Sequence, residues 1–131
     1  MLKQVILYTM AAAAATSCGD ARDPSGAKDM CAKLEQAGIV KNCRETVPAK
    51  LSARAKHRYD FDLVSLPERG GAVMDFASTE DYNATVSAYA EAALLAGSHR
   101  YGSSRARIFV QLNEGASLEV GKRTKQLVDE L

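Results

Sequence analysis

Two short stretches in which every second residue is apolar, with a turn between them, are the strongest indication of what this chain folds into. The first stretch, residues 57–66, alternates Tyr59, Phe61, Leu63 and Ser65 with Arg58, Asp60 and Asp62. The second, residues 72–77, places Ala72, Met74 and Phe76 on one face. Consecutive side chains of a strand point to opposite faces, so both patterns are typical of half-buried strands. With the turn residues PERGG between them, at 67–71, they predict a β-hairpin.

Three helices and two more strands are predicted around this hairpin. The first helix covers residues 27–37 and ends at Gly38, which suits the left-handed conformation that closes many helices. The second begins after Ser78, a capping residue, and runs to residue 96. The third follows Ser117, another capping residue. The additional strands are expected at residues 39–46 and 105–112, with a polar loop over residues 98–104.

The order of these elements, α-β-β-β-α-β-α, predicts an α+β fold. About four mostly antiparallel strands, with helices packed on one face, would bury the apolar stripes in a small two-layer sandwich. We expect residues 27–131 to form a single domain of ordinary size, large enough for its own core.

The first 19 residues have the pattern of an export signal. One cation, Lys3, precedes an apolar run from Val5 to Ala15, and small residues then lead to Cys18. The run of 11 residues is too short to span a bilayer core of about 30 Å. The segment resembles a bacterial lipoprotein signal peptide with its lipobox.

This resemblance implies cleavage before Cys18, which makes residues 1–17 a signal peptide and residues 18–26 a lipidated tether. The Cys18 thiol would then carry a diacylglycerol, and its new amine an acyl chain such as palmitate, which together anchor the protein stably in the bacterial cell envelope. Gly19, in place of Asp, favours the outer membrane and leaves the side of the membrane open. Ala15 also suits ordinary signal peptidase, which would release the protein. An alanine-rich first helix in a cytosolic protein is the third interpretation.

Outside the leader, Cys31 and Cys43 remain, on either side of the turn at Gly38. The envelope is oxidising, so we expect a disulfide between them, with two buried thiols as the alternative. The spacing differs from C-x-x-C and the two histidines lie far away in the sequence, so no metal site is expected.

Positive and negative charges balance in the mature chain, with 16 Lys and Arg against 16 Asp and Glu once Lys3 is excluded. A general nucleic-acid-binding protein would be basic, so no nucleic-acid partner is expected. Residues 41–58 depart from this balance with one acid, Glu45, and six cations, namely Lys41, Arg44, Lys50, Arg54, Lys56 and Arg58. Such a segment could contact anionic lipid head groups or an acidic partner, or form a solvated loop and strand edge.

A triplet of the same three residues occurs twice, as His57-Arg58-Tyr59 and as His99-Arg100-Tyr101. If both copies lie at one end of the sheet, they would form a cationic and aromatic patch that could hold an anionic ligand through charge-assisted hydrogen bonds. The alternative is a coincidence on a solvated surface.

Carboxylates also cluster on the predicted hairpin, at Asp60, Asp62 and Asp75. Neighbouring carboxylates can act as an acid and a base, but ion pairs with Arg58 or Arg69 on an exposed face are the favoured interpretation. The sequence has no nucleophile elbow, no zinc-protease helix and no glycine-rich phosphate loop. No catalytic residues and no cofactor are therefore expected.

Together these features predict a membrane-anchored envelope lipoprotein that acts as a non-enzymatic interaction or accessory module, with an envelope protein as partner. A small-ligand-binding domain, with weak hydrolase activity as a variant, is one alternative. An inhibitor or immunity-type lipoprotein acting on an envelope enzyme is another.

Overall fold

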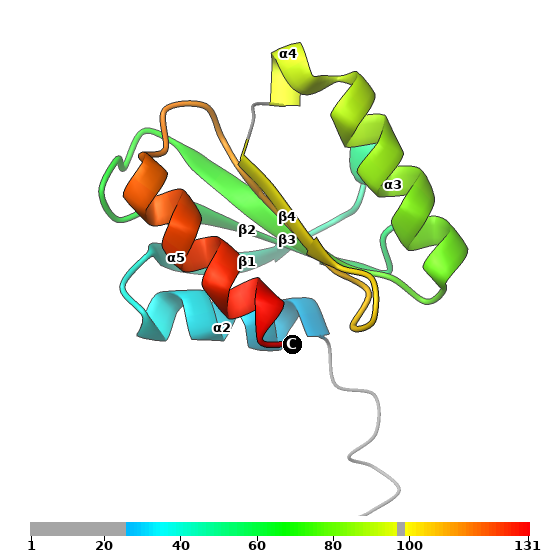
Figure 1. Ribbon diagram of the computed structural model, residues 1–131, viewed down its shortest axis with the longest axis horizontal. Coiled ribbons are helices and arrows are strands. Elements are labelled where there is room, and N and C mark those ends of the chain that lie inside the picture. The colour runs from blue at the N-terminus through cyan, green and yellow to red at the C-terminus, as the bar shows by residue number, and fades with distance from the viewer. Residues whose placement is uncertain (1–25, 97–98) are drawn as a thin grey trace, which may run out of the picture.

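A computed structural model describes residues 26–96 and 99–131 of the chain (Figure 1). The leader, Cys18 and nearly all of the predicted tether lie outside the described residues.

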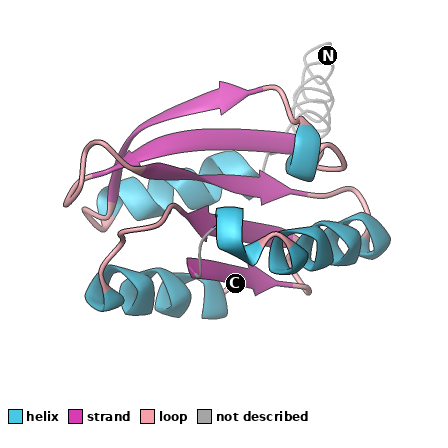
Figure 2. Ribbon diagram, turned by 90° about the horizontal axis from the view of Figure 1, so that it is seen from above, coloured by secondary structure: helices cyan, strands magenta, loops and turns pink. Residues whose placement is uncertain are grey.

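The described residues form a five-stranded sheet in which every neighbouring pair of strands is antiparallel. Its strands are β1 (Val40–Thr46), β2 (His57–Leu63), β3 (Gly70–Asp75), β4 (His99–Ser103) and β5 (Ile108–Leu112). They lie side by side in the order β1-β2-β3-β5-β4 (Figure 2). The predicted α+β class and hairpin are confirmed, with five strands instead of about four.

Two details of the strand prediction are wrong. The polar loop predicted over residues 98–104 contains strand β4, which pairs with β5 so that Tyr101 lies opposite Val110. The hairpin turn covers residues 64–69, because β3 already begins at Gly70. A side chain at Gly71 would meet the backbone of β5, since a Cβ there would lie 2.1 Å from the carbonyl oxygen of Gln111. This glycine therefore allows close strand pairing and does not form the turn.

Helices cover both faces of the sheet, so the prediction of helices on one face is wrong. The helices are α2 (Gly26–Gln36), α3 (Thr79–Glu91), the short α4 (Ala93–Ala96) and α5 (Leu118–Asp129). Helices α2 and α5 pack on one face and α3 on the other (Figure 1). The central strands are buried on both sides: Val73 faces the α2 side, and Met74 faces α3. A sheet that is apolar on both faces requires three layers.

The predicted helix ends agree with the structure at three positions. The Ser78 side chain accepts a hydrogen bond from the Asp81 amide at 3.1 Å, and Ser117 accepts one from the Val120 amide at 3.2 Å. Gly38 closes α2 with a φ of +76°. The helix predicted up to residue 96 instead ends at Glu91.

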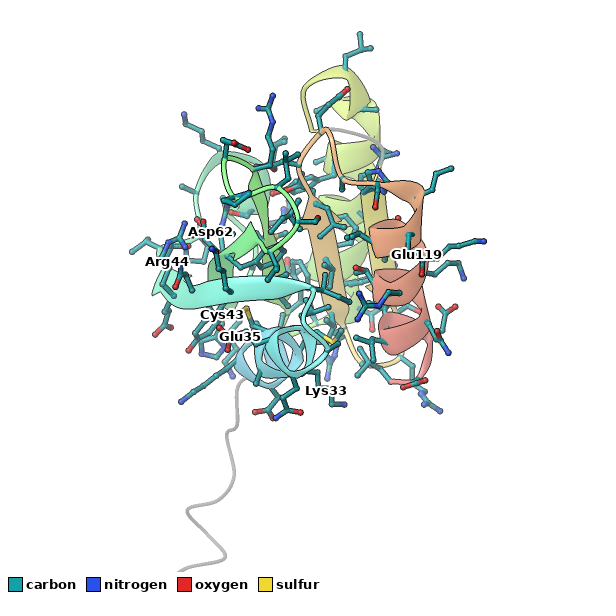
Figure 3. The ribbon with its side chains drawn as sticks, turned by 90° about the vertical axis from the view of Figure 1, so that its left-hand side faces the viewer. Lys33, Glu35, Cys43, Arg44, Asp62 and Glu119 are labelled. Atoms are coloured by element: carbon teal, nitrogen blue, oxygen red, sulfur yellow. A yellow bond between two sulfur atoms is a disulfide. The ribbon has the colours of Figure 1, made fainter. Side chains whose placement is uncertain are left out.

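The predicted disulfide is confirmed. The Cys31–Cys43 bond joins α2 to β1, with the two Cα atoms 6.3 Å apart. Next to it, the Cys43 amide donates a hydrogen bond of 3.2 Å to the Glu35 carboxylate of α2. Figure 3 shows Glu35 and Cys43 side by side. Two kinds of link therefore hold the first helix to the edge strand.

Candidate functional site

The two His-Arg-Tyr triplets do not come together. Strand β2 carries one and β4 the other, and β3 and β5 lie between them. His57 pairs with Asp75 near one end of the sheet, whereas His99 pairs with Leu112 near the opposite end. Three strand spacings across the sheet and four residues along it separate the two histidines by about 20 Å. One small ligand cannot bridge them, so the structure does not form the predicted joint patch.

Two residues of the second triplet, His99 and Tyr101, are packed against α5. The ring Nδ1 of His99 and the hydroxyl of Tyr101 are 2.9 Å apart. A Cβ on Gly121 of α5 would lie 2.4 Å from that hydroxyl and 2.9 Å from the His99 nitrogen. Burial raises the pKa of Tyr101, and Lys125 lowers it by a smaller amount. The pair therefore fills the space between β4 and α5.

We expect Gly121→Ala to destabilise the domain by about 1–3 kcal/mol, the usual cost of overpacking a tight contact. Tyr101→Phe removes the hydroxyl that the new methyl group meets. Tyr101→Phe should therefore cost less stability in the Gly121→Ala background than in the wild type. A double-mutant cycle of urea unfolding would measure this difference. Additive effects of the two substitutions would contradict this packing role.

The first triplet contributes His57 to a pocket at one end of the sheet. The pocket has a volume of about 290 Å³, and Gly26, Lys56, His57, Asp75 and Arg107 are among its lining residues. We call this end the Gly26 end, because α2 begins there. The loop of residues 47–56 and the β4–β5 turn of residues 104–107 lie at the same end.

Asp75 is the centre of the hydrogen bonds in this pocket. The Asp75 side chain is 11% exposed, and its carboxylate accepts hydrogen bonds from the amides of Ala27, at 2.9 Å, and His57, at 3.0 Å. The Nδ1 atom of the His57 ring lies 3.0 Å from the same carboxylate. When Nδ1 carries the ring proton it donates to Asp75, which leaves Nε2 as an acceptor. Asp75 thus caps the first turn of α2.

The grouping of Asp75 with Asp60 and Asp62 is wrong, because Asp75 faces α2 and the other two lie on the α3 side. Asp60 pairs with Arg58 at 2.7 Å, along strand β2 and not across the hairpin. Asp62 pairs with Arg44 at 3.4 Å instead of Arg69. The hydrogen bond from Asn42 lowers the pKa of Asp62, and the positive charge of Arg44 lowers it further.

These ion pairs line a second hollow, at the opposite end of the sheet on the α3 side. It has a volume of about 250 Å³. We call it the charged groove, lined by Arg44, Arg58, Asp60, Phe61, Asp62, Glu68, Arg69, Gly70, Gly71, Gln111 and Asn113. Figure 3 looks at this end of the molecule and shows Arg44 and Asp62 close together. The groove lies where α3 does not cover the sheet, and sequence reasoning missed it because its residues come from four separate segments.

The basic segment of residues 41–58 is divided between the two ends of the sheet. Arg44 and Arg58 belong to the charged groove. Lys50, Arg54 and Lys56 lie in the loop at the Gly26 end, where Arg54 pairs with Asp81 at 3.4 Å. The segment therefore does not form one continuous cationic patch.

Within the described residues, no group of three or more His, Cys, Asp or Glu side chains is placed to hold a metal ion. In the same part of the chain, no helix has both the length and the apolar character needed to cross a membrane. No protein-family model, curated protein or solved structure matches this chain.

Proposed function

We propose that this protein is a bacterial envelope lipoprotein, held in the membrane by lipid on Cys18, whose domain binds an envelope protein through the charged groove. The lipobox-like leader supports the anchor. The Cys31–Cys43 disulfide supports export, because such bonds persist in oxidising compartments.

The position of the charged groove is the observation that carries the binding role. The groove lies at one end of the sheet, and Gly26, where the tether enters the domain, lies at the other end. A domain anchored through Gly26 presents this groove away from the membrane. The Arg44–Asp62 and Arg58–Asp60 pairs are partly exposed. Exposed pairs contribute little to stability, but charges of both signs in a hollow can select a complementary partner.

The His57 pocket favours a second candidate function, the binding of a small anion. Lys56, His57 and Arg107 line the pocket together. The Asp75 carboxylate already accepts hydrogen bonds from the α2 amide and from His57, so a ligand would contact the other side of the imidazole ring. Chemical-shift changes of His57 on addition of inorganic phosphate would test this candidate.

The anchor is tested by Cys18→Ser. We expect this variant to leave the membrane fraction completely, because the residue that accepts the lipid is lost. Cys31→Ala/Cys43→Ala is the matched control: it removes two sulfur atoms, keeps Cys18 and should stay in the membrane fraction. Retention of Cys18→Ser in membranes would refute anchoring through this residue.

The groove is tested by a photo-crosslinking amino acid at Arg69, on the groove, and at Lys33, on α2 (Figure 3). In intact cells we expect one adduct of defined mass from position 69 and none from position 33. Arg44→Glu places a third acid beside Asp60 and Asp62 and should abolish that adduct. Adducts that are equal at both positions, or that persist in Arg44→Glu, would refute the groove as the binding surface.

A further inference from the structure

The tether that the leader implies is short compared with the domain. Gly26 lies eight positions after Cys18, which corresponds to at most about 27 Å of extended chain. A compact domain of this size has a radius of gyration of about 13 Å, which corresponds to a sphere about 33 Å across, so the domain is wider than the tether is long. If Cys18 carries the lipid, the Gly26 end of the sheet stays close to the membrane surface.

The loop of residues 47–56 projects from this same end. Lys56, its last residue, lines the pocket together with Gly26 and Arg107. Figure 1 also shows the first turn of α2 and the β4–β5 turn at one end of the sheet. The end of the loop at Lys56 therefore lies close to the start of α2, whereas Arg54 and Ala55 pack toward α3.

The composition of this loop suits a phospholipid surface. It contains three cations, Lys50, Arg54 and Lys56, and no acid. It also holds Val47 and Leu51, which are 86% and 38% exposed. Cations attract phosphate head groups, and exposed aliphatic side chains can enter the boundary between head groups and acyl chains.

The loop is held in a defined shape by its own contacts. Residues Lys50–Ser52 form a short 3-10 helix, η2, and Ser52 is completely buried. The Ser52 hydroxyl accepts hydrogen bonds from the Ala49 amide, at 3.1 Å, and from Arg58, at 2.8 Å. Val47 and Leu51 are thus exposed on an ordered loop, and docking would need little ordering of the backbone.

We infer that the loop of residues 47–56 docks on the anionic phospholipid surface of the membrane that holds the anchor. This inference rests on the proposed lipid anchor, because the tether supplies the high local concentration that makes weak contacts effective. Arg54 forms an ion pair with Asp81. Lys50 and Lys56 are the other two cations of the loop, and the test changes both.

The experiment uses the protein made from the full-length gene, purified in detergent from whole cells and reconstituted into vesicles of brominated phosphatidylcholine, with or without phosphatidylglycerol. A fluorescent amino acid replaces Val47 in one sample. In the other it replaces Val64, which is 45% exposed and follows β2 at the opposite end of the sheet. With phosphatidylglycerol, we expect quenching by the brominated lipid to be several-fold stronger at position 47 than at position 64.

Charge variants test whether the loop cations cause the difference in quenching between positions 47 and 64. Lys50→Glu/Lys56→Glu should remove the difference between the two positions, whereas the matched change Lys33→Glu/Lys122→Glu, on the exposed faces of α2 and α5, should keep it. Any one of three results overturns the proposal. The first is equal quenching at positions 47 and 64, and the second is the same quenching at position 47 with and without phosphatidylglycerol. In the third result, Lys50→Glu/Lys56→Glu leaves the difference between the two positions unchanged.

Failure of the anchor is recognised separately, by the intact mass of the purified protein. If Cys18 carries no diacylglycerol, the protein is coupled to a maleimide lipid through the Cys18 thiol, since the disulfide occupies Cys31 and Cys43. The comparison of quenching at positions 47 and 64 then tests docking of the loop by itself, even though the proposed anchor has failed.

Discussion

Removal of the Cys31–Cys43 disulfide will lower the free energy of unfolding by about 3 kcal/mol, as the loop-entropy model gives for a closed loop of this size. The bond closes a loop across a sequence separation of 12 and joins α2 to the edge strand β1. Without it, the unfolded chain gains conformational freedom and the folded chain loses a link between helix and sheet. Urea unfolding with and without reductant, in a Cys18→Ser background that prevents intermolecular disulfides, measures the difference.

Cys31→Ala/Cys43→Ala provides a second measurement of this effect. Cys31 is buried and belongs to the core, so the alanine variant should lose slightly more stability than reduction does. The Glu35 carboxylate still accepts the Cys43 amide, and we expect α2 to remain on the sheet. Equal urea midpoints for the oxidised and reduced protein would contradict a stabilising bond.

The elements that follow local rules could be predicted from the sequence. The caps at Ser78 and Ser117 and the left-handed residue at Gly38 depend on neighbours within a few positions. The disulfide could also be predicted, because its cysteines flank one short turn between a helix and a strand. In each case the interacting groups are close in the chain, so the pattern of residues contains the information.

Strand β4 could not be predicted because its support is distant in the chain. Its sequence, HRYGS, has one large apolar residue, Tyr101. That side chain packs at Gly121, a glycine of α5 that no strand pattern indicates. The two-sided sheet was missed for a related reason. The alternating pattern gives no inner face to apolar side chains such as Val73 and Phe109, although each belongs to a core on one side of the sheet.

The candidate sites depend on the register of the strands, which the alternating pattern alone does not determine. Placing the turn at residues 67–71 shifts the hairpin, so His57 and Asp75 do not appear as partners. With the turn at residues 64–69, they lie directly opposite each other. The contact between Asp75 and Ala27 spans 48 positions of the chain and has no local signal. The correct hairpin register is the observation that would have found the pair.

Asp75→Ala is expected to lower the free energy of unfolding by about 3 kcal/mol, because it leaves the Ala27 and His57 amides without their shared acceptor. The carboxylate is nearly buried, so water can replace it only in part. Hydrogen exchange should show the largest change in the first turn of α2, because that turn loses its cap. Chemical denaturation measures the total loss.

Two further substitutions separate the parts of this interaction. Asp75→Asn keeps one oxygen acceptor but turns an amide donor toward the second amide, so it should recover less than half of the lost stability. His57→Ala removes the ring and keeps both backbone hydrogen bonds of Asp75, so it should cost only about 1 kcal/mol. If His57→Ala and Asp75→Ala are equally destabilising, the ring contact dominates and Asp75 is not the cap of α2. If both are silent, the Gly26 end is held by the core contacts of Met30 and Leu34 alone.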